Sequence, residues 1–283
     1  MLDPFSLPFV QRGLAEVLLL AVGAGLLGTW IVLRGLAFYT HAVGTAAFPG
    51  LVVADGLGFA APLGALGAAA IFAATVGRLA RRGRDGYDSL TALVLVGALA
   101  LGVILASDVF RSGAHVESLL FGSLLAIGTG DVVLAAAVSA LSLGTTLVLG
   151  RHWLATGFDQ HGARTLGVNS AITDAALLAL VALVSVAALS AVGALLATAL
   201  LVVPAATARL WTQRLGSWQL ASIALVALEG TVGLWLSVKF NAPPGATIAV
   251  LASAVFGLAA ALRALPLRAR RHVPTAPAGA MNR

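Results

Sequence analysis

Residues 175–208 read AALLALVALVSVAALSAVGALLATALLVVPAATA and contain no charged side chain over 34 residues. An α-helix of that length is about 51 Å long, whereas the hydrocarbon core of a bilayer is about 30 Å thick. A single crossing cannot accommodate this stretch. We therefore expect two membrane helices, 172–189 and 192–210, separated by a very tight turn at Ser190-Ala191. The stretch indicates a polytopic membrane protein built from helices.

The composition of the whole chain agrees with this interpretation. Of its 283 residues, 60% are hydrophobic and only 10% are charged, and the mean hydropathy is +1.01. A soluble domain has about 25% charged residues, so water-soluble, coiled-coil and disordered architectures are excluded as the main one. We expect an all-α membrane protein with about nine transmembrane helices, eight being possible. The other seven predicted spans are 14–33, 36–54, 59–77, 89–107, 132–150, 218–238 and 246–262.

The basic residues predict the orientation of these spans. With nine crossings and the N-terminus outside, 14 basic residues fall on the inner side and 3 on the outer side, as the positive-inside rule requires. The inner group comprises Arg34, Arg78, Arg81, Arg82, Arg84, Arg151, Arg164, Arg209, Arg214, Arg263, Arg268, Arg270, Arg271 and Arg283. The apolar patch 119–128 is too short to cross, and a crossing there would move the first arginine cluster outside. We expect it to be re-entrant or interfacial.

Several classes of chemistry are excluded by the residues that the chain lacks. It has no cysteine, and its single lysine, Lys239, does not follow a glycine-rich phosphate loop. Thiol catalysis, disulfides and a Walker-type nucleotide site are therefore excluded. Neither G-x-S-x-G nor H-E-x-x-H occurs, which argues against an intramembrane hydrolase. We expect no enzyme activity from this chain, and any ATP must be hydrolysed by another subunit.

The domain organisation is simple. We expect one transmembrane domain over residues 1–265 and a short, basic, disordered tail over 266–283. The longest polar interruption, 151–169, lies on the inner side. Within it Asp159 can cap a short helix and Gly167 can end it in the left-handed conformation. A helix of two turns is not stable alone in water, so it must lie against either the membrane surface or a cytoplasmic partner.

Polar residues within or beside the spans are candidates for a cation pathway, because such residues are costly in lipid. Glu229 lies midway along span 218–238. It is either a cation ligand or gate, or a carboxyl that is neutralised by burial or bonded to a neighbouring helix. His41 and Thr45 share one helix face; imidazole suits zinc and related ions, although a structural role is the alternative. Asp55 could meet an arriving cation or simply form an Asp-Gly turn. Pro204 should kink its helix.

Six ordered blocks, which span nearly the whole chain, resemble the permease subunits of zinc, manganese and iron ABC importers. They are GLLGTWIVLRGLAF (25–38), HAVGTAAFPG (41–50), LLFGSLLAIGTGD (119–131), FDQHGARTLGV (158–168), VGALLATALLVVPAATA (192–208) and GLWLSVKFNAPPGATI (233–248). The wording of the second block is closest to permeases of zinc systems.

This resemblance implies a function and a set of partners. The permease would lie in the bacterial inner membrane as a homodimer, with two copies of a separate ATPase inside and a metal-binding solute-binding protein docked outside. It would pass a divalent cation, with zinc expected, to the cytoplasm by alternating access, and it would hold no permanent cofactor. Asp159, Ala163 and Gly167 match the pattern of the family's ATPase-coupling helix.

One departure from the family pattern concerns the metal ligands. Many members have an Asp and a His four residues apart before the Pro-Gly of the second span, and this chain has His41 and Thr45 at those positions. The pair therefore offers one strong ligand rather than two. Glu229, or the second copy's His41, is expected to compensate. The pathway candidates are thus His41, Thr45, Asp55 and Glu229.

Two other functions fit a chain of this kind. The first is a cation transporter or channel that works without ATP, with Glu229 as its proton relay; the sequence shows no inverted repeat with paired broken helices to favour it. The second is an ABC permease for a metal chelate such as a siderophore, against which the short chain and the metal-type blocks argue.

Overall fold

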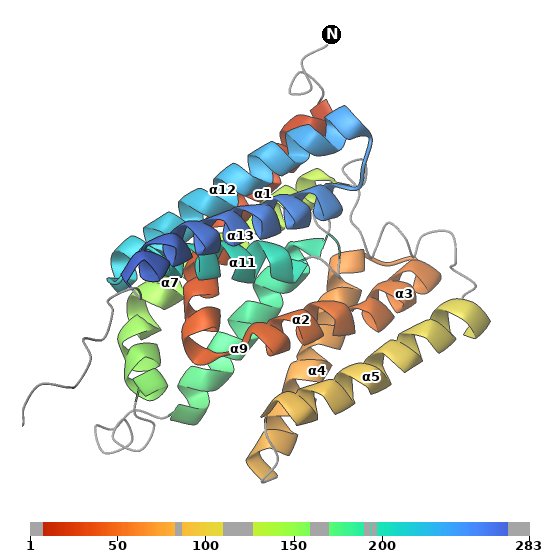
Figure 1. Cartoon of the computed structure of the whole chain (residues 1–283). Coiled ribbons are helices and arrows are strands. Elements are labelled where there is room, and N and C mark those ends of the chain that lie inside the picture. The colour runs from red at the N-terminus through yellow and green to blue at the C-terminus, as the bar shows by residue number, and fades with distance from the viewer. Residues whose placement is uncertain are drawn as a thin grey trace, which may run out of the picture.

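The computed structural model describes residues 8–82, 87–109, 127–158, 170–189, 193 and 197–270. Within these ranges every regular element is a helix, which confirms the all-α prediction (Figure 1). The elements are α1 (Pro8–Arg34), α2 (Ala37–Ala46), α3 (Phe48–Leu57), α4 (Ala61–Arg82), α5 (Tyr87–Ile104), the π-helical turn η2 (Leu105–Val109), α7 (Thr129–Phe158), α9 (Ser170–Ala187), α11 (Ala197–Arg209), α12 (Leu215–Phe240) and α13 (Pro244–Arg270).

All nine predicted spans fall on these helices. Seven stretches of the described residues are long and apolar enough to cross a membrane, with α2 and α3 together forming one of them. The two helices of the opening stretch, α9 and α11, are shorter. They are separate helices, as predicted, since α9 ends at Ala187 and α11 begins at Ala197. The predicted tight turn at Ser190-Ala191 lies outside the described residues. Gly193, between them, has a φ of +85°, a conformation that favours glycine.

The second predicted span, 36–54, is broken in the structure. Helix α2 ends at Ala46, and α3 begins at Phe48 with Pro49 in its first turn. Proline has no N–H to donate, and its ring clashes with the carbonyl four residues earlier, so it is tolerated in the first turn but not further inside a helix. The break gives α2 an end inside the protein, immediately after Thr45.

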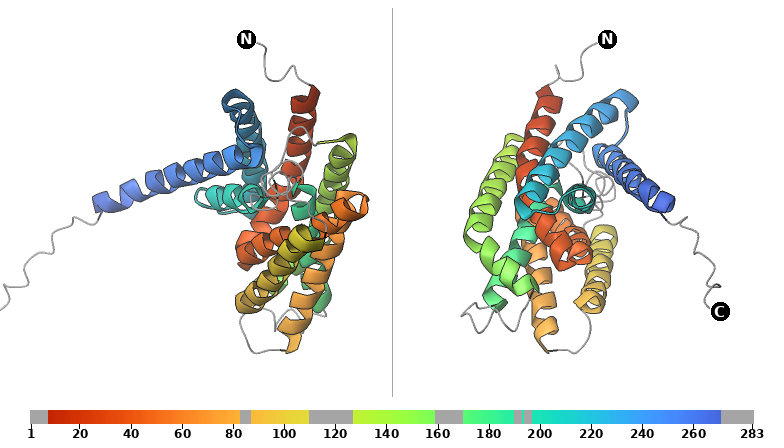
Figure 2. Two further views of the ribbon diagram at one scale, coloured as in Figure 1. Left: turned by 90° about the vertical axis from the view of Figure 1, so that its right-hand side faces the viewer. Right: turned by 60° about the vertical axis from the view of Figure 1, so that its left-hand side comes forward.

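Helix α1 forms the centre of the fold. It packs against α12, α7 and α11, and Figure 2 shows it between α7 and α12. Its residues from Leu20 to Ile31 are almost entirely buried, with Leu20, Leu27 and Ile31 fully inside. By contrast α5 and α13 expose large apolar side chains, among them Leu93 and Val250 at 67% and 70%. Such surfaces suit lipid rather than water.

Glycines allow the closest helix contacts. A Cβ atom on Gly50 of α3 would lie 2.0 Å from the carbonyl oxygen of Gly64 of α4, and a Cβ atom on Gly28 of α1 would lie 2.2 Å from that of Leu201. Only glycine fits at such contacts, as is common where membrane helices pack through small residues. Helix α13 continues to Arg270, past the predicted domain boundary at 265. The tail from 271 onward lies outside the described residues.

Candidate functional site

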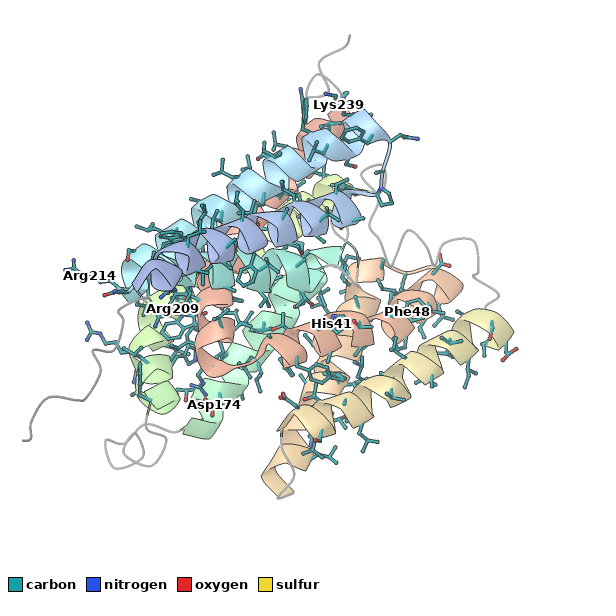
Figure 3. All side chains as sticks on the ribbon, in the orientation of Figure 1. His41, Phe48, Asp174, Arg209, Arg214 and Lys239 are labelled. Carbon is teal, nitrogen blue, oxygen red and sulfur yellow. The ribbon has the colours of Figure 1, made fainter. Side chains whose placement is uncertain are left out.

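His41 lies on α2 and faces α11 (Figure 3). Its Nδ1 atom is 3.4 Å from the hydroxyl oxygen of Thr198 on α11, and the side chain is half-buried. Thr45, one turn later, is buried, and its hydroxyl donates to the carbonyl oxygen of His41 at 2.9 Å. The predicted shared helix is confirmed. The Thr45 hydroxyl oxygen keeps its lone pairs for a further partner.

Thr198 was missed by the sequence interpretation. It is a single hydroxyl in an apolar run, VGALLATALLVV, and such a residue has no sequence feature that shows which helix it faces. Its contact with His41 joins two segments that are 157 residues apart in the sequence. The structure thus adds a second oxygen-bearing side chain beside the imidazole.

Glu229 faces the protein interior, as predicted. Its side chain is only 3% exposed, and neither carboxylate oxygen has a hydrogen-bond partner among the described residues. Gly230, the next residue on α12, packs directly on Val17 of α1. Burying a carboxyl without partners is costly, and intramembrane acids that face the protein interior usually serve an ion or proton pathway.

The predicted pathway residues do not form a ready-made metal centre. In the part of the chain that the structure describes, no three His, Cys, Asp or Glu side chains come together as a metal-binding group. His41 is on α2 and Glu229 is on α12, while α11 packs against both of these helices. A cation that binds to His41 or Glu229 would therefore have few protein ligands.

Asp55 lies in the last turn of α3 rather than in the turn after it. Its side chain is exposed, and its carbonyl oxygen accepts the N–H of Gly58 at 3.4 Å. Pro204 lies inside α11, whose helical geometry continues on both sides of it to Arg209. The kink at Pro204 stays a prediction.

The inner loop lies largely outside the described residues. Asp159, Ala163 and Gly167 all belong to the undescribed stretch 159–169. Residues 119–126 of the patch 119–128 belong to another undescribed stretch, 110–126. The boundary predicted at residue 150 is wrong, because α7 continues to Phe158 and residues 151–158 are helical. Both flanks of the stretch 159–169 are described, since α9 begins at Ser170.

A large groove lies away from the candidate residues. It has a volume of about 520 Å³, is lined by α3, α4, α5 and η2, and is almost wholly apolar. None of the four predicted pathway residues lines it.

Two further acids lie within predicted spans and were not identified from the sequence, although the criterion that selected Glu229 applies to them. They are Glu16, which is fully buried in α1, and Asp174 in α9.

Comparison with known proteins covers nearly the whole chain. The model of the ABC 3 transport family matches residues 6–263. The "Manganese transport system membrane protein MntC" of Halalkalibacterium halodurans is 30% identical, over 90% of this chain and 87% of that protein. The "Manganese import system permease protein ScaB" of Streptococcus parasanguinis is 33% identical over 93% and 94%. The "Probable iron transport system membrane protein" of Haemophilus influenzae is 28% identical over 95% and 98%.

Solved structures share the fold. A chain in "PsaBC from Streptococcus pneumoniae in complex with Fab" superposes with a TM-score of 0.81 at 29% identity, covering 91% of this chain and 93% of that one. A putative metal-chelate type ABC transporter, solved in an inward-facing conformation, has a TM-score of 0.68 at 17% identity over 88% and 85%. At that identity the second likeness concerns the fold alone.

Proposed function

Because the chain belongs to the ABC 3 transport family, we propose that it is the membrane-spanning permease subunit of an ATP-driven importer, which carries a divalent metal cation into the cytoplasm. The observation that carries this proposal is the family match over residues 6–263 together with a TM-score of 0.81 to a chain of PsaBC. The described residues contain seven apolar stretches long enough to cross a membrane and two shorter apolar helices, which agrees with it.

The cargo is a divalent transition-metal cation. Three relatives are named for manganese or iron transport, which favours manganese, whereas the wording of HAVGTAAFPG at 41–50 favours zinc. The side chains available to a cation are one imidazole, hydroxyls and carboxylates. Imidazole suits zinc, and carboxylate oxygens suit manganese, so this ligand set fits either ion. We take manganese as the first cargo to test and zinc as the second.

The route is proposed to pass His41, Thr45 and Glu229, with Thr198 beside His41 and Asp55 where the ion arrives. Support comes from the buried carboxyl of Glu229, which has no hydrogen-bond partner in the part of the chain that the structure describes, and from the contact between His41 and Thr198. Sparse ligands suit transport, because a closed four-ligand site would retain the ion. In alternating access the ion is held briefly and then released inward.

The remaining subunits are also part of the proposal. Two copies of this chain would form the pathway, a metal-loaded binding protein would dock outside, and two ATPase subunits would bind inside at the loop that holds Asp159, Ala163 and Gly167. The N-terminus would lie outside and the C-terminus in the cytoplasm of the bacterial inner membrane. The absence of a phosphate-binding loop from the sequence supports a separate ATPase.

The metal content of whole cells tests this function and identifies the cargo. A strain that lacks the gene is grown in metal-limited medium, and manganese, zinc and iron are measured together by mass spectrometry. We expect a severalfold loss of one metal, manganese first, that is restored by the gene on a plasmid. A loss confined to zinc would assign zinc instead. Unchanged contents of all three metals would contradict a role in metal import.

A further inference from the structure

Arg34, the last residue of α1, joins three helices at once. Its Nη1 atom donates to the hydroxyl oxygen of Thr156 at 2.7 Å and to the carbonyl oxygen of Trp153 at 3.2 Å, both on α7. Its Nη2 atom pairs with the carboxylate of Asp174 on α9. The Arg34 side chain is only 14% exposed. A guanidinium group can make this set of contacts because it presents five N–H donors in a rigid fork.

Neighbouring contacts fix the same junction. The buried indole N–H of Trp153 donates to the carbonyl oxygen of Thr173 on α9 at 2.9 Å. The rings of Trp153 and Trp30 of α1 meet edge to face, with centroids 5.5 Å apart. Gly157 leaves room for the Arg34 stem, since a Cβ atom there would lie 3.1 Å from Arg34 Cδ. The end of α1 is thus fastened to α7 and α9 together.

The position of this junction in the chain is its important feature. Thr156 lies in the last turn of α7 and Asp174 in the second turn of α9, so the two residues lie on either side of residues 159–169, which hold the predicted coupling helix. Arg34 is followed at once by Gly35, whose φ of +67° turns the chain into α2. His41 lies about one turn along α2, which begins at Ala37. Figure 3 labels Asp174 on α9 and His41 on α2.

We propose that Arg34, Thr156 and Asp174 form a latch that transmits movement of the inner loop's two flanks, through the turn at Gly35, to α2 and the metal pathway. Arg34 is then a positioning residue for His41 and contacts no metal itself. This inference rests on the proposed function. A displacement of α7 and α9 together carries the end of α1 with it, because three bonds from one side chain hold the helices together.

A simpler role for Arg34 would be to stabilise the end of α1, since a cation at a helix C-terminus interacts favourably with the helix dipole. The two roles predict different results for Arg34→Lys. A lysine keeps the charge at the helix end, but it cannot bond α7 and α9 with the same fixed fork. Arg209 in the last turn of α11 offers a matched control. Its Nη1 atom donates to the nearby carbonyl oxygen of Thr212 at 3.1 Å, and its guanidinium lies over the Trp218 ring of α12, 4.9 Å from the centroid. A lysine there keeps both the charge and a cation over the ring.

The test uses the full transporter, with its ATPase and binding protein, reconstituted in liposomes with Mn²⁺ as the probe. ATP hydrolysis and manganese uptake are measured on the same preparation, and the ratio of uptake to hydrolysis is compared. We expect Arg34→Lys and Asp174→Asn each to lower this ratio by about fivefold, on the scale on which residues along a coupling path act. Thr156→Val removes the bond from Arg34 to the Thr156 hydroxyl but leaves the bonds of Arg34 to Trp153 and Asp174, so it should have a smaller effect. Arg209→Lys should have none.

The possible failures are distinguishable. If the Arg34→Lys transporter assembles and keeps the wild-type ratio, the latch is wrong while the proposed function stands. If Arg34→Lys does not assemble, Asp174→Asn and Thr156→Val decide by the same ratio. If the wild-type transporter takes up none of Mn²⁺, Zn²⁺ and Fe²⁺ with ATP, the proposed function fails and the latch fails with it.

Discussion

Replacement of Glu229 by glutamine is expected to lower the rate of metal uptake by about tenfold or more, the scale on which loss of a group that supports metal binding acts. Glutamine has nearly the same shape, so the packing of α12 against α1 should persist. What is lost is a group that can release its proton and become a negatively charged ligand when a cation arrives, which an amide cannot do. The Glu229 side chain is 3% exposed and has no hydrogen-bond partner among the described residues.

The measurement is the initial rate of Mn²⁺ and Zn²⁺ uptake by cells that produce equal amounts of each variant. Ser222→Ala is the matched control on the same helix. Ser222 is also buried, but its hydroxyl donates only to the carbonyl oxygen of Trp218 on its own helix, at 2.8 Å. An unchanged rate in Glu229→Gln would remove Glu229 from the pathway and leave it as a buried, neutral carboxyl.

Replacement of Asp159 by alanine or of Gly167 by valine is expected to reduce uptake to the level of cells that lack the gene. Asp159 is the predicted cap of the coupling helix, and Gly167 is its predicted left-handed end, where a β-branched residue is strained. Both changes should disturb contact with the ATPase without altering the membrane helices, because the loop lies outside all nine predicted spans.

The readout is uptake together with the amount of permease in the membrane fraction. Thr165→Ala, in the same loop but outside the matched pattern, serves as the control and should transport normally. Normal uptake in both the Asp159 and Gly167 variants, at normal protein levels, would show that this loop does not couple transport to ATP.

The helices could be predicted because lipid leaves the chain little choice. Backbone groups in the hydrocarbon region must be satisfied within a helix, so a charge-free stretch such as 175–208 indicates two helices from its length alone. The break within span 36–54 is less evident, since its only sequence signal is Pro49. The prediction placed Pro49 within one continuous helix, whereas in the structure it lies in the first turn of a new helix that begins at Phe48.

The site was only partly predictable, because its contacts join distant segments. Glu229 was identified as an acid within a span and is buried as expected. The pairing of Arg34 with Asp174 links residues 140 positions apart, and that of His41 with Thr198 links residues 157 apart. No periodicity or motif specifies such partners. They follow from how α1, α7, α9 and α11 pack around one another.

The central claim is that this chain moves metal only together with a separate ATPase. It is tested most directly by Mn²⁺ and Zn²⁺ uptake into liposomes that contain either the permease alone or the permease with its ATPase subunits and binding protein, with and without ATP. We predict uptake of one of these ions only in the complete system and only when ATP is present. Equal uptake by the permease alone, driven by an ion gradient and independent of ATP, would contradict the account and assign the chain as a secondary transporter or channel.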